Sequence, residues 1–282
     1  MIQGNIEQGV KWDPAYRQAT VDKYLKLSSV AGTPAAELII WPEAATPFYL
    51  QDPTKFSTKV RELPQQVDSF LLTGSPAYQK VGADDYRYFN SAFLFSPQGK
   101  ELGRSDKIHL VPFGEYVPFG SLLTFVNKLV AGVGDFSPGT VKPLPLNGHS
   151  LGVLICYEAI FPELARDYVR QGSDLLINIT NDAWFGRSSA PYQHLAMTRF
   201  RSVENRIWLA RAANTGFSAL ISPSGRVVES GSLFESMALS GQVGLGSEPT
   251  FYTRFGDVFA YTCLLISVGF LFFAFLAYKR QS

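Results

Sequence analysis

Cysteine and histidine are scarce in this chain of 282 residues, which contains two cysteines and three histidines. Two cysteines, one of them inside an apolar C-terminal stretch, cannot form the framework of a disulfide-rich protein and indicate no redox compartment. The histidines, His109, His149 and His194, fall in unrelated segments without the spacing of metal ligands. We therefore expect no metal site and no cofactor.

An excess of charge is also missing, because 25 basic and 24 acidic residues nearly cancel. No basic patch indicates a nucleic-acid partner. The first residues, Met1 to Ile6, lack the basic region and long apolar core of a secretory signal peptide, so we expect none. The length suffices for one large domain with an appendage.

One cysteine follows an apolar run of the kind that forms a buried strand. The run Leu151 to Ile155 is short and contains β-branched residues, Cys156 comes directly after it, and residues 158–164 indicate a turn into a helix with Pro162 in its first turn. Backbone N–H groups at a helix N-terminus can stabilise a thiolate. Cys156 is therefore a candidate nucleophile, and the alternative is a small buried hydrophobe.

Two charged residues follow apolar runs upstream of this cysteine. Glu43 comes after the run 38–41 and a proline, and Lys107 lies in the segment 103–115. Taken alone, Glu43 could be a neighbour of a helix N-cap and Lys107 a solvated surface charge. Together with Cys156 they supply a carboxylate base, an ammonium and a thiol, which can activate a nucleophile and neutralise a tetrahedral oxyanion.

Four motifs resemble, in this order, those of the apolipoprotein N-acyltransferases, a family within the nitrilase (carbon–nitrogen hydrolase) superfamily. The resemblance extends from Gln3 to the apolar tail, and four motifs in register are far more specific than any one alone. The motifs are Trp41-Pro42-Glu43, Lys107 with Val111-Pro112-Phe113-Gly114-Glu115, Cys156-Tyr157-Glu158, and Asn181-Asp182-Ala183-Trp184-Phe185-Gly186.

The resemblance implies acyl transfer in two steps. Glu43 takes the thiol proton, Cys156 attacks an ester carbonyl of a membrane phospholipid, and Lys107 stabilises the oxyanion before a thioester remains. The acyl chain then passes to the N-terminal amine of a diacylglyceryl-cysteine apolipoprotein. Five further residues are expected to support the chemistry or to bind substrate: Glu115, Tyr157, Glu158, Trp184 and Phe185. For the last two, the alternative is a place among ordinary core aromatics.

The arrangement of apolar runs predicts an α/β fold. Buried strands are indicated at 67–74, 88–96, 151–155 and 173–180, amphipathic helices at 15–30 and 190–206, and a strand–turn–strand unit at 218–228. Strands that alternate with helices favour sheets packed between helices. The resemblance makes this a nitrilase-like αββα sandwich over residues 1–250.

A segment close behind Glu115 has apolar side chains at helical spacing. It extends from Phe119 to Val133 and includes Leu122, Phe125 and Leu129. The segment can pack on the core as an ordinary helix, or it can form an arm beside the active site that dips into lipid. The apolar tail described next favours the arm.

The C-terminal stretch from Val258 to Tyr278 contains no charged residue and is followed by Lys279 and Arg280. As a helix with a rise of about 1.5 Å per residue it would cross the roughly 30 Å core of a bilayer, so we predict a transmembrane helix over 257–279. The basic end favours a cytoplasmic C-terminus. The catalytic domain would then lie on the periplasmic side of a bacterial inner membrane.

The resemblance also bears on the extent of the protein. Apolipoprotein N-acyltransferases carry several membrane helices ahead of their nitrilase domain, and this sequence starts where that domain starts. We expect a C-terminal fragment of a longer protein. The alternative is a tail-anchored protein whose domain stays in the cytoplasm.

Two other classes of function are compatible with the same residues. A membrane-tethered amidase of the nitrilase type would use the triad with water as acceptor to hydrolyse small amides, and a polar pocket without a lipid-facing arm would favour it. A catalytically silent interaction module is the second, and the complete triad argues against it.

Overall fold

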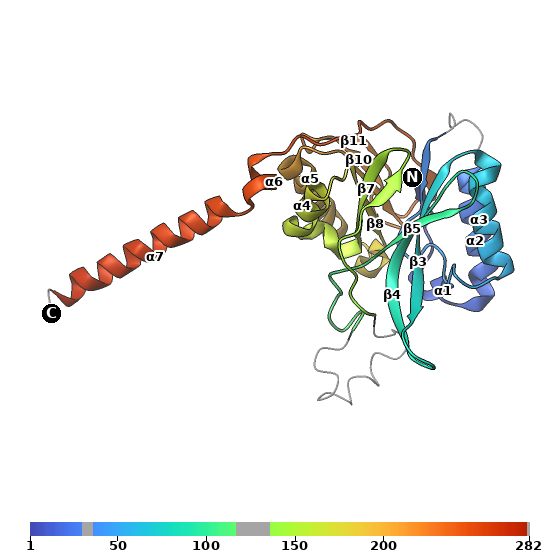
Figure 1. Cartoon of the computed structure of the whole chain (residues 1–282), viewed down its shortest axis with the longest axis horizontal. Coiled ribbons are helices and arrows are strands. Elements are labelled where there is room, and N and C mark those ends of the chain that lie inside the picture. The colour runs from blue at the N-terminus through green and yellow to red at the C-terminus, as the bar shows by residue number, and fades with distance from the viewer. Residues whose placement is uncertain (30–35, 117–135, 281–282) are drawn as a thin grey trace.

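The computed structural model describes residues 1–29, 36–116 and 136–280 (Figure 1). Within these residues the strands form a six-stranded sheet, a four-stranded sheet and a short two-stranded sheet. The arm predicted between Phe119 and Val133 lies outside the described residues, as does Val30 at the end of the first predicted helix.

The six-stranded sheet has the order β11-β10-β9-β8-β7-β6. Its central strands β7, β8 and β9 run parallel, and the outer strands pair antiparallel. Every residue of β8 is buried, as expected for a strand covered on both faces. The bounds are β6 Leu144–Leu146, β7 His149–Ile155, β8 Leu175–Thr180, β9 Leu209–Ala213, β10 Ala219–Ile221 and β11 Val227–Ser230.

The four-stranded sheet has the order β2-β3-β4-β5, in which β2 and β3 are parallel and the other pairs antiparallel. The bounds are β2 Leu38–Ile40, β3 Phe70–Lys80, β4 Tyr86–Phe95 and β5 Glu101–Asp106. The two-stranded sheet pairs β1 Ile2–Gln3 with β12 Met237–Ala238, so the two ends of the domain sequence meet.

Helices cover the outer faces of the two large sheets (Figure 1). The longer ones are α2 Arg17–Ser28 and α3 Lys55–Val67 on the four-stranded sheet, and α4 Pro162–Arg170 and α5 Ala190–Asn205 on the six-stranded sheet. Short helical turns are α1 Gln8–Lys11, η1 Pro14–Tyr16, η3 Cys156–Ile160, η4 Asp182–Phe185 and α6 Phe251–Phe255.

Three apolar clusters hold these layers together. Between the sheets, Leu72 and Leu94 meet Val153 and Ile177. On the outer faces, one cluster packs α2 and α3 on the four-stranded sheet and another packs α4 on the six-stranded sheet. Each layer therefore buries an apolar face against its neighbour, which confirms the predicted αββα sandwich.

The C-terminal helix α7, Val258–Lys279, extends away from the sandwich (Figure 1). Its most apolar window has a mean hydropathy of 2.3, and none of that window is buried in the described part of the chain. An apolar helix of this length without protein packing is long enough to cross a bilayer. The helix indicates an association with a membrane.

The structure corrects one predicted boundary near β3. Residues 67–69 do not begin the strand, because Val67 ends α3 and Asp68 adopts a left-handed conformation with φ of 48° as its C-cap. The sequence analysis did not predict α3. Its N-terminal capping box pairs Thr54 with Ser57 rather than with the usual Glu or Gln, and Pro64 lies in its last turns.

Candidate active site

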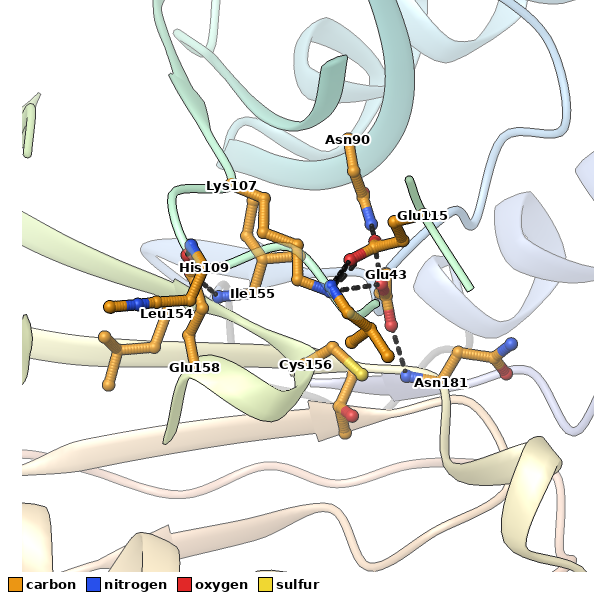
Figure 2. A network of polar contacts seen from close by, with 12 residues as sticks. Glu43, Asn90, Lys107, His109, Glu115, Leu154, Ile155, Cys156, Glu158 and Asn181 are labelled. Atoms are coloured by element: carbon orange, nitrogen blue, oxygen red, sulfur yellow. Dashed lines mark hydrogen bonds and ion pairs between the residues drawn. The ribbon is translucent and has the colours of Figure 1, made fainter. Parts of the chain in front are cut away.

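The site lies where several strands end between the two sheets. Glu43 follows β2, Lys107 follows β5, Cys156 follows β7 and Asn181 follows β8. Figure 2 shows these side chains converging with those of Asn90 and Glu115. The fold thus brings together the three residues that the sequence predicts as a triad.

The carboxylate of Glu43 is held at both oxygens. Asn90 Nδ2 donates to Oε1 at 2.7 Å, and the backbone N–H of Asn181 donates to Oε2 at 2.9 Å (Figure 2). The chain turns directly after it, since Ala44 has a φ of 47°. A Cβ at Gly74 of β3 would lie 2.6 Å from the Pro42 carbonyl oxygen, so glycine permits this turn to pack against the strand.

Lys107 is 1% exposed, which rules out the alternative of a solvated surface charge. Its ammonium lies 2.8 Å from Glu115 Oε2 and 3.8 Å from Glu43 Oε1. Burial alone would lower the pKa of Lys107, but the negative charges of Cys156 when ionised, of Glu43 and of Glu115 raise it above its ordinary value. The ammonium is therefore permanent at neutral pH.

Glu115 links the parts of this cluster. Its carboxylate accepts from Lys107 Nζ, from Asn90 Nδ2 at 2.9 Å and from the backbone N–H of Val111 at 2.9 Å. Asn90 donates to Glu43 as well, so one amide bridges two carboxylates. Asn90 was not predicted from the sequence, although a polar residue inside the apolar run of β4 is a signal.

Cys156 begins η3 with a left-handed backbone, at a φ of 58°. Its sulfur points toward Glu43 and Lys107 (Figure 2). Burial first, and then the charge of Glu43, raises the pKa of the thiol to about 12, with Lys107 opposing. Burial therefore favours the protonated thiol in the resting site, and stabilisation of a thiolate by backbone N–H groups stays a prediction.

Glu158 fixes the turn that carries Cys156 against the loop that carries Lys107. One of its oxygens accepts from the backbone N–H of Ile108 at 2.6 Å and of His109 at 3.0 Å, and the other from that of Ile155 at 2.7 Å. Burial raises the pKa of Glu158 to about 7, against the effect of these N–H groups. Glu158 therefore positions Cys156 by holding the backbone on both sides of the site.

A buried polar network contacts the backbone carbonyl group of Cys156. His194 Nε2 and Asn178 Nδ2 each lie 3.2 Å from this oxygen, which can only accept. Burial, followed by the charge of Arg211, lowers the pKa of His194, while Asp182, 3.1 Å from Nδ1, opposes this change. Arg211 is fully buried and forms an ion pair with Asp182 at 2.7 Å. This network was not predicted from the sequence.

The three aromatic residues predicted for the site lie closer to the surface than the hydrogen-bonded cluster. Tyr157 is 42% exposed and contacts Phe161 edge-on, and Trp184 is 68% exposed, so Trp184 is not a core aromatic. Phe185 is half-buried and stands edge-on to His194 at a ring distance of 6.2 Å. The structure brings none of these three into the hydrogen-bonded cluster among its described residues.

A second lysine, Lys11 at the end of α1, also reaches the site. It is 2% exposed, and its ammonium donates to the backbone carbonyl oxygen of Glu43 at 3.0 Å. Burial lowers the pKa of Lys11 to about 8, while Glu43 and Cys156 oppose that change. No motif in the sequence pointed to this residue, because its burial depends on contacts between distant segments.

Within residues 1–29, 36–116 and 136–280 no group of His, Cys, Asp and Glu has the arrangement to hold a metal ion. The chemistry available to the described residues is that of a thiol, a carboxylate base and a fixed ammonium. Such a set can transfer an acyl group through a covalent intermediate.

Comparisons with known proteins agree with this geometry. A sequence profile of the carbon–nitrogen hydrolases matches residues 1–247. An apolipoprotein N-acyltransferase of Geobacter metallireducens is 52% identical over the whole chain, and one of Brucella suis is 39% identical over 82% of it. The chain spans about half the length of these relatives, 54% of the first and 44% of the second.

Solved structures give the same fold at lower identity. A mutant amidase of Nesterenkonia sp. AN1, whose active-site cysteine has added to acrylamide, superposes with a TM-score of 0.63 at 20% identity, covering 93% of this chain and 97% of that one. A carbon–nitrogen hydrolase of Helicobacter pylori has a TM-score of 0.59 at 18% identity, covering 79% and 83%. At these identities the likeness concerns the fold.

Proposed function

The chain belongs to the carbon–nitrogen hydrolase family, and from this membership we propose that it is the catalytic part of a membrane-bound N-acyltransferase acting on lipoproteins. The observation that carries the proposal is the thiol of Cys156 facing a buried cluster of Glu43, Lys107 and Glu115. The shared name of the relatives supports the substrate class. The exposed apolar helix α7 supports access to a bilayer.

In the first half-reaction Cys156 is the nucleophile and Glu43 the base. Glu43 takes the thiol proton, the sulfur attacks the ester carbonyl of a phospholipid, and the tetrahedral oxyanion forms beside Lys107. The ester C–O bond then breaks, and the proton on Glu43 passes to the departing alkoxide. Lysophospholipid leaves, and the acyl chain remains on Cys156 as a thioester.

In the second half-reaction the acceptor is the free amine of a diacylglyceryl-cysteine at the N-terminus of an apolipoprotein. The amine attacks the thioester, and Glu43 accepts the proton that the amine loses. The C–S bond breaks, the sulfur of Cys156 recovers the proton, and an amide bond remains on the lipoprotein. The raised pKa of the buried thiol supports a proton transfer by Glu43 in both directions.

The supporting residues act through position or through the substrate. Glu115 orients the site by holding Lys107 and sharing Asn90 with Glu43, and Glu158 fixes the turn of Cys156. The exposed rings of Tyr157 and Trp184, and the half-buried ring of Phe185, which follows Trp184 in sequence, are proposed to contact lipid chains.

The proposed location is the bacterial inner membrane. Helix α7 would cross it, the sandwich would lie on the periplasmic side, and Lys279 and Arg280 would lie in the cytoplasm. The segment between Phe119 and Val133, outside the described residues, stays a predicted arm for lipid entry.

The test incubates the chain with phospholipid vesicles and a diacylglyceryl-cysteine peptide, and measures products by mass spectrometry. We expect N-acylated peptide and lysophospholipid in equal amounts. Release of free fatty acid with an unchanged peptide would contradict the transferase proposal and favour a hydrolase of the nitrilase type. An unmodified Cys156 with no product would favour the catalytically silent module.

A further inference from the structure

We propose that Lys11 is a second cationic positioning residue of this site, which fixes the backbone of Glu43 and supplies positive charge that favours ionisation of Cys156. The inference deepens the proposed function, since it takes Cys156 as nucleophile and Glu43 as base. Nothing in the motifs that define the triad includes this lysine.

The first argument is the contact of Lys11 with the turn that carries Glu43. Its ammonium donates to the Glu43 carbonyl oxygen at 3.0 Å, at the point where Ala44 adopts a φ of 47°. A non-glycine residue in this region is strained and persists only when its surroundings hold it. The contact with Lys11 and the close packing of Gly74 hold this turn from two sides.

The second argument is the balance of charge around the thiol. Two carboxylates, Glu43 and Glu115, face one ammonium, that of Lys107, which lies 2.8 Å from Glu115 and 3.8 Å from Glu43. Lys11 adds a second positive charge to the side of Glu43. Without Lys11, the group formed by Glu43, Glu115 and Lys107 would carry one net negative charge before the thiol ionises. A thiolate at Cys156 would add a second negative charge.

The burial of Lys11 supports an electrostatic role. The negative charge of Glu43, and that of Cys156 once it is ionised, favour the ammonium form of Lys11. Burial nevertheless lowers the pKa of Lys11 to about 8, so the ammonium is present below this pH and is lost above it. The site therefore loses a positive charge in the mildly alkaline range, where an isolated thiol would only begin to ionise.

The experiment measures the reactivity of Cys156 in the full chain with Cys263 replaced by serine, so that a single thiol remains. The probe is iodoacetamide, a neutral alkylating agent, and the rate is recorded against pH. We expect Lys11→Met to lower the rate about tenfold at neutral pH, where Lys11 is charged, and to approach the parental rate above about pH 8, where the parent loses that charge.

Three further variants separate the two roles of the lysine. Lys11→Arg keeps the charge and should stay within about twofold of the parent. Lys11→Gln keeps a donor for the Glu43 carbonyl group without the charge, so its profile should follow that of Lys11→Met. Lys26→Met, at an exposed lysine of α2, is the matched control and should change nothing.

The result that would overturn the proposal is a folded Lys11→Gln or Lys11→Met protein with the parental rate and pH profile. If Lys11→Met fails to fold, Lys11→Gln and Lys11→Arg decide the question. A parental pH profile in Lys11→Gln, or a displaced profile in Lys11→Arg, contradicts a charge role. Alkylation needs no phospholipid and no acceptor, so this outcome is independent of whether the chain transfers acyl groups.

Discussion

The thiol of Cys156 is protonated at neutral pH because its surroundings remove water and place the carboxylate of Glu43 against it. A neighbouring carboxylate disfavours a thiolate, whereas the ammonium of Lys107 favours it. The proton must move to Glu43 as the sulfur attacks. In the proposed mechanism Lys107, whose ammonium is held by Glu115, stabilises the negative charge that develops on the substrate.

The first prediction concerns that ammonium. Lys107→Met keeps the length of the side chain and removes its charge, and we expect the rate of Cys156 acylation to fall by roughly a hundredfold to a thousandfold, as for loss of one oxyanion donor. Stability should fall by about 3–5 kcal/mol, because the change leaves two carboxylates buried without their partner. Single-turnover acylation and denaturant unfolding measure the two effects.

A double variant controls for the loss of stability. Lys107→Met with Glu115→Gln removes one positive and one negative charge, so stability should return in large part while the rate stays low. Recovery of the rate together with stability would mean that Lys107 acts on the fold rather than on the oxyanion.

The proposed triad could be assembled from the sequence because Glu43 and Cys156 follow apolar runs that form strands, and Lys107 lies in a motif of the family resemblance. Ends of neighbouring strands meet at one edge, so Glu43, Lys107 and Cys156 could be placed together before their contacts were known. Asn90 and Lys11 could not be placed in this way. Their roles depend on one amide bridging two carboxylates and on one ammonium meeting a backbone carbonyl group, contacts between segments that have no common motif.

At the next scale, α5, β8 and β9 join to support the strained turn η3. His194 of α5 and Asn178 of β8 donate to the carbonyl group of Cys156, and Arg211 of β9 holds both through hydrogen bonds. Asp182 at the start of η4 neutralises Arg211. The turn η3, which carries Cys156, therefore depends on the buried ion pair between Asp182 and Arg211.

The second prediction follows from the charge of Asp182. Burial would raise the pKa of this carboxyl, but Arg211 and His194 outweigh burial and hold it well below its usual range. The folded state therefore stays deprotonated while the unfolded state takes up a proton below about pH 4, so the free energy of unfolding should fall as pH decreases from there. Asp182→Asn should flatten this dependence and lower stability near neutrality.

Urea unfolding between about pH 2 and pH 7 measures this dependence, and Asp84→Asn at an exposed carboxylate is the matched control. The range below about pH 4 is the informative one, because Glu158 and Glu204, whose pKa values burial raises to about 7, act in the opposite sense at higher pH. An acid dependence equal in Asp182→Asn and the parent would contradict this account of the ion pair.

Elements with strong periodicity were predictable, and those with conflicting signals were not. The runs that became β7 and β8 and the helix from Ala190 were found near their observed bounds. Helix α3 was missed because Pro64 lies inside it, where a proline removes one backbone hydrogen bond of the helix and usually signals a break.

The sandwich and the helix α7 differ in how their apolar side chains are covered, and this difference indicates a membrane-associated molecule. The sandwich buries its apolar side chains in three clusters, whereas α7 exposes an uninterrupted apolar surface. Water is a poor environment for such a helix, and a bilayer is a suitable one. The sequence predicted this helix well because a long uncharged run needs no tertiary information.

The third prediction is that α7 carries membrane attachment without shaping the site. Leu265→Arg with Phe270→Arg places two charges in the middle of the helix, and each should disfavour insertion by about 2.5–3.5 kcal/mol. The protein should leave the membrane fraction after an alkaline wash, while Cys156 keeps its alkylation rate. Leu265→Ile with Phe270→Leu is the control, and retention of the arginine variant in membranes would show that attachment lies elsewhere.

The central claim is that Cys156 becomes an acyl thioester, and intact-mass spectrometry after incubation with phospholipid vesicles tests it most directly. The account predicts an adduct of one acyl chain that hydroxylamine removes, its absence from Cys156→Ser, and its persistence in Cys263→Ser. Serine lacks the acidity of the thiol, and the site offers a carboxylate rather than a histidine as base. An acyl group on Cys263, or an adduct undiminished in Cys156→Ser, would contradict the account.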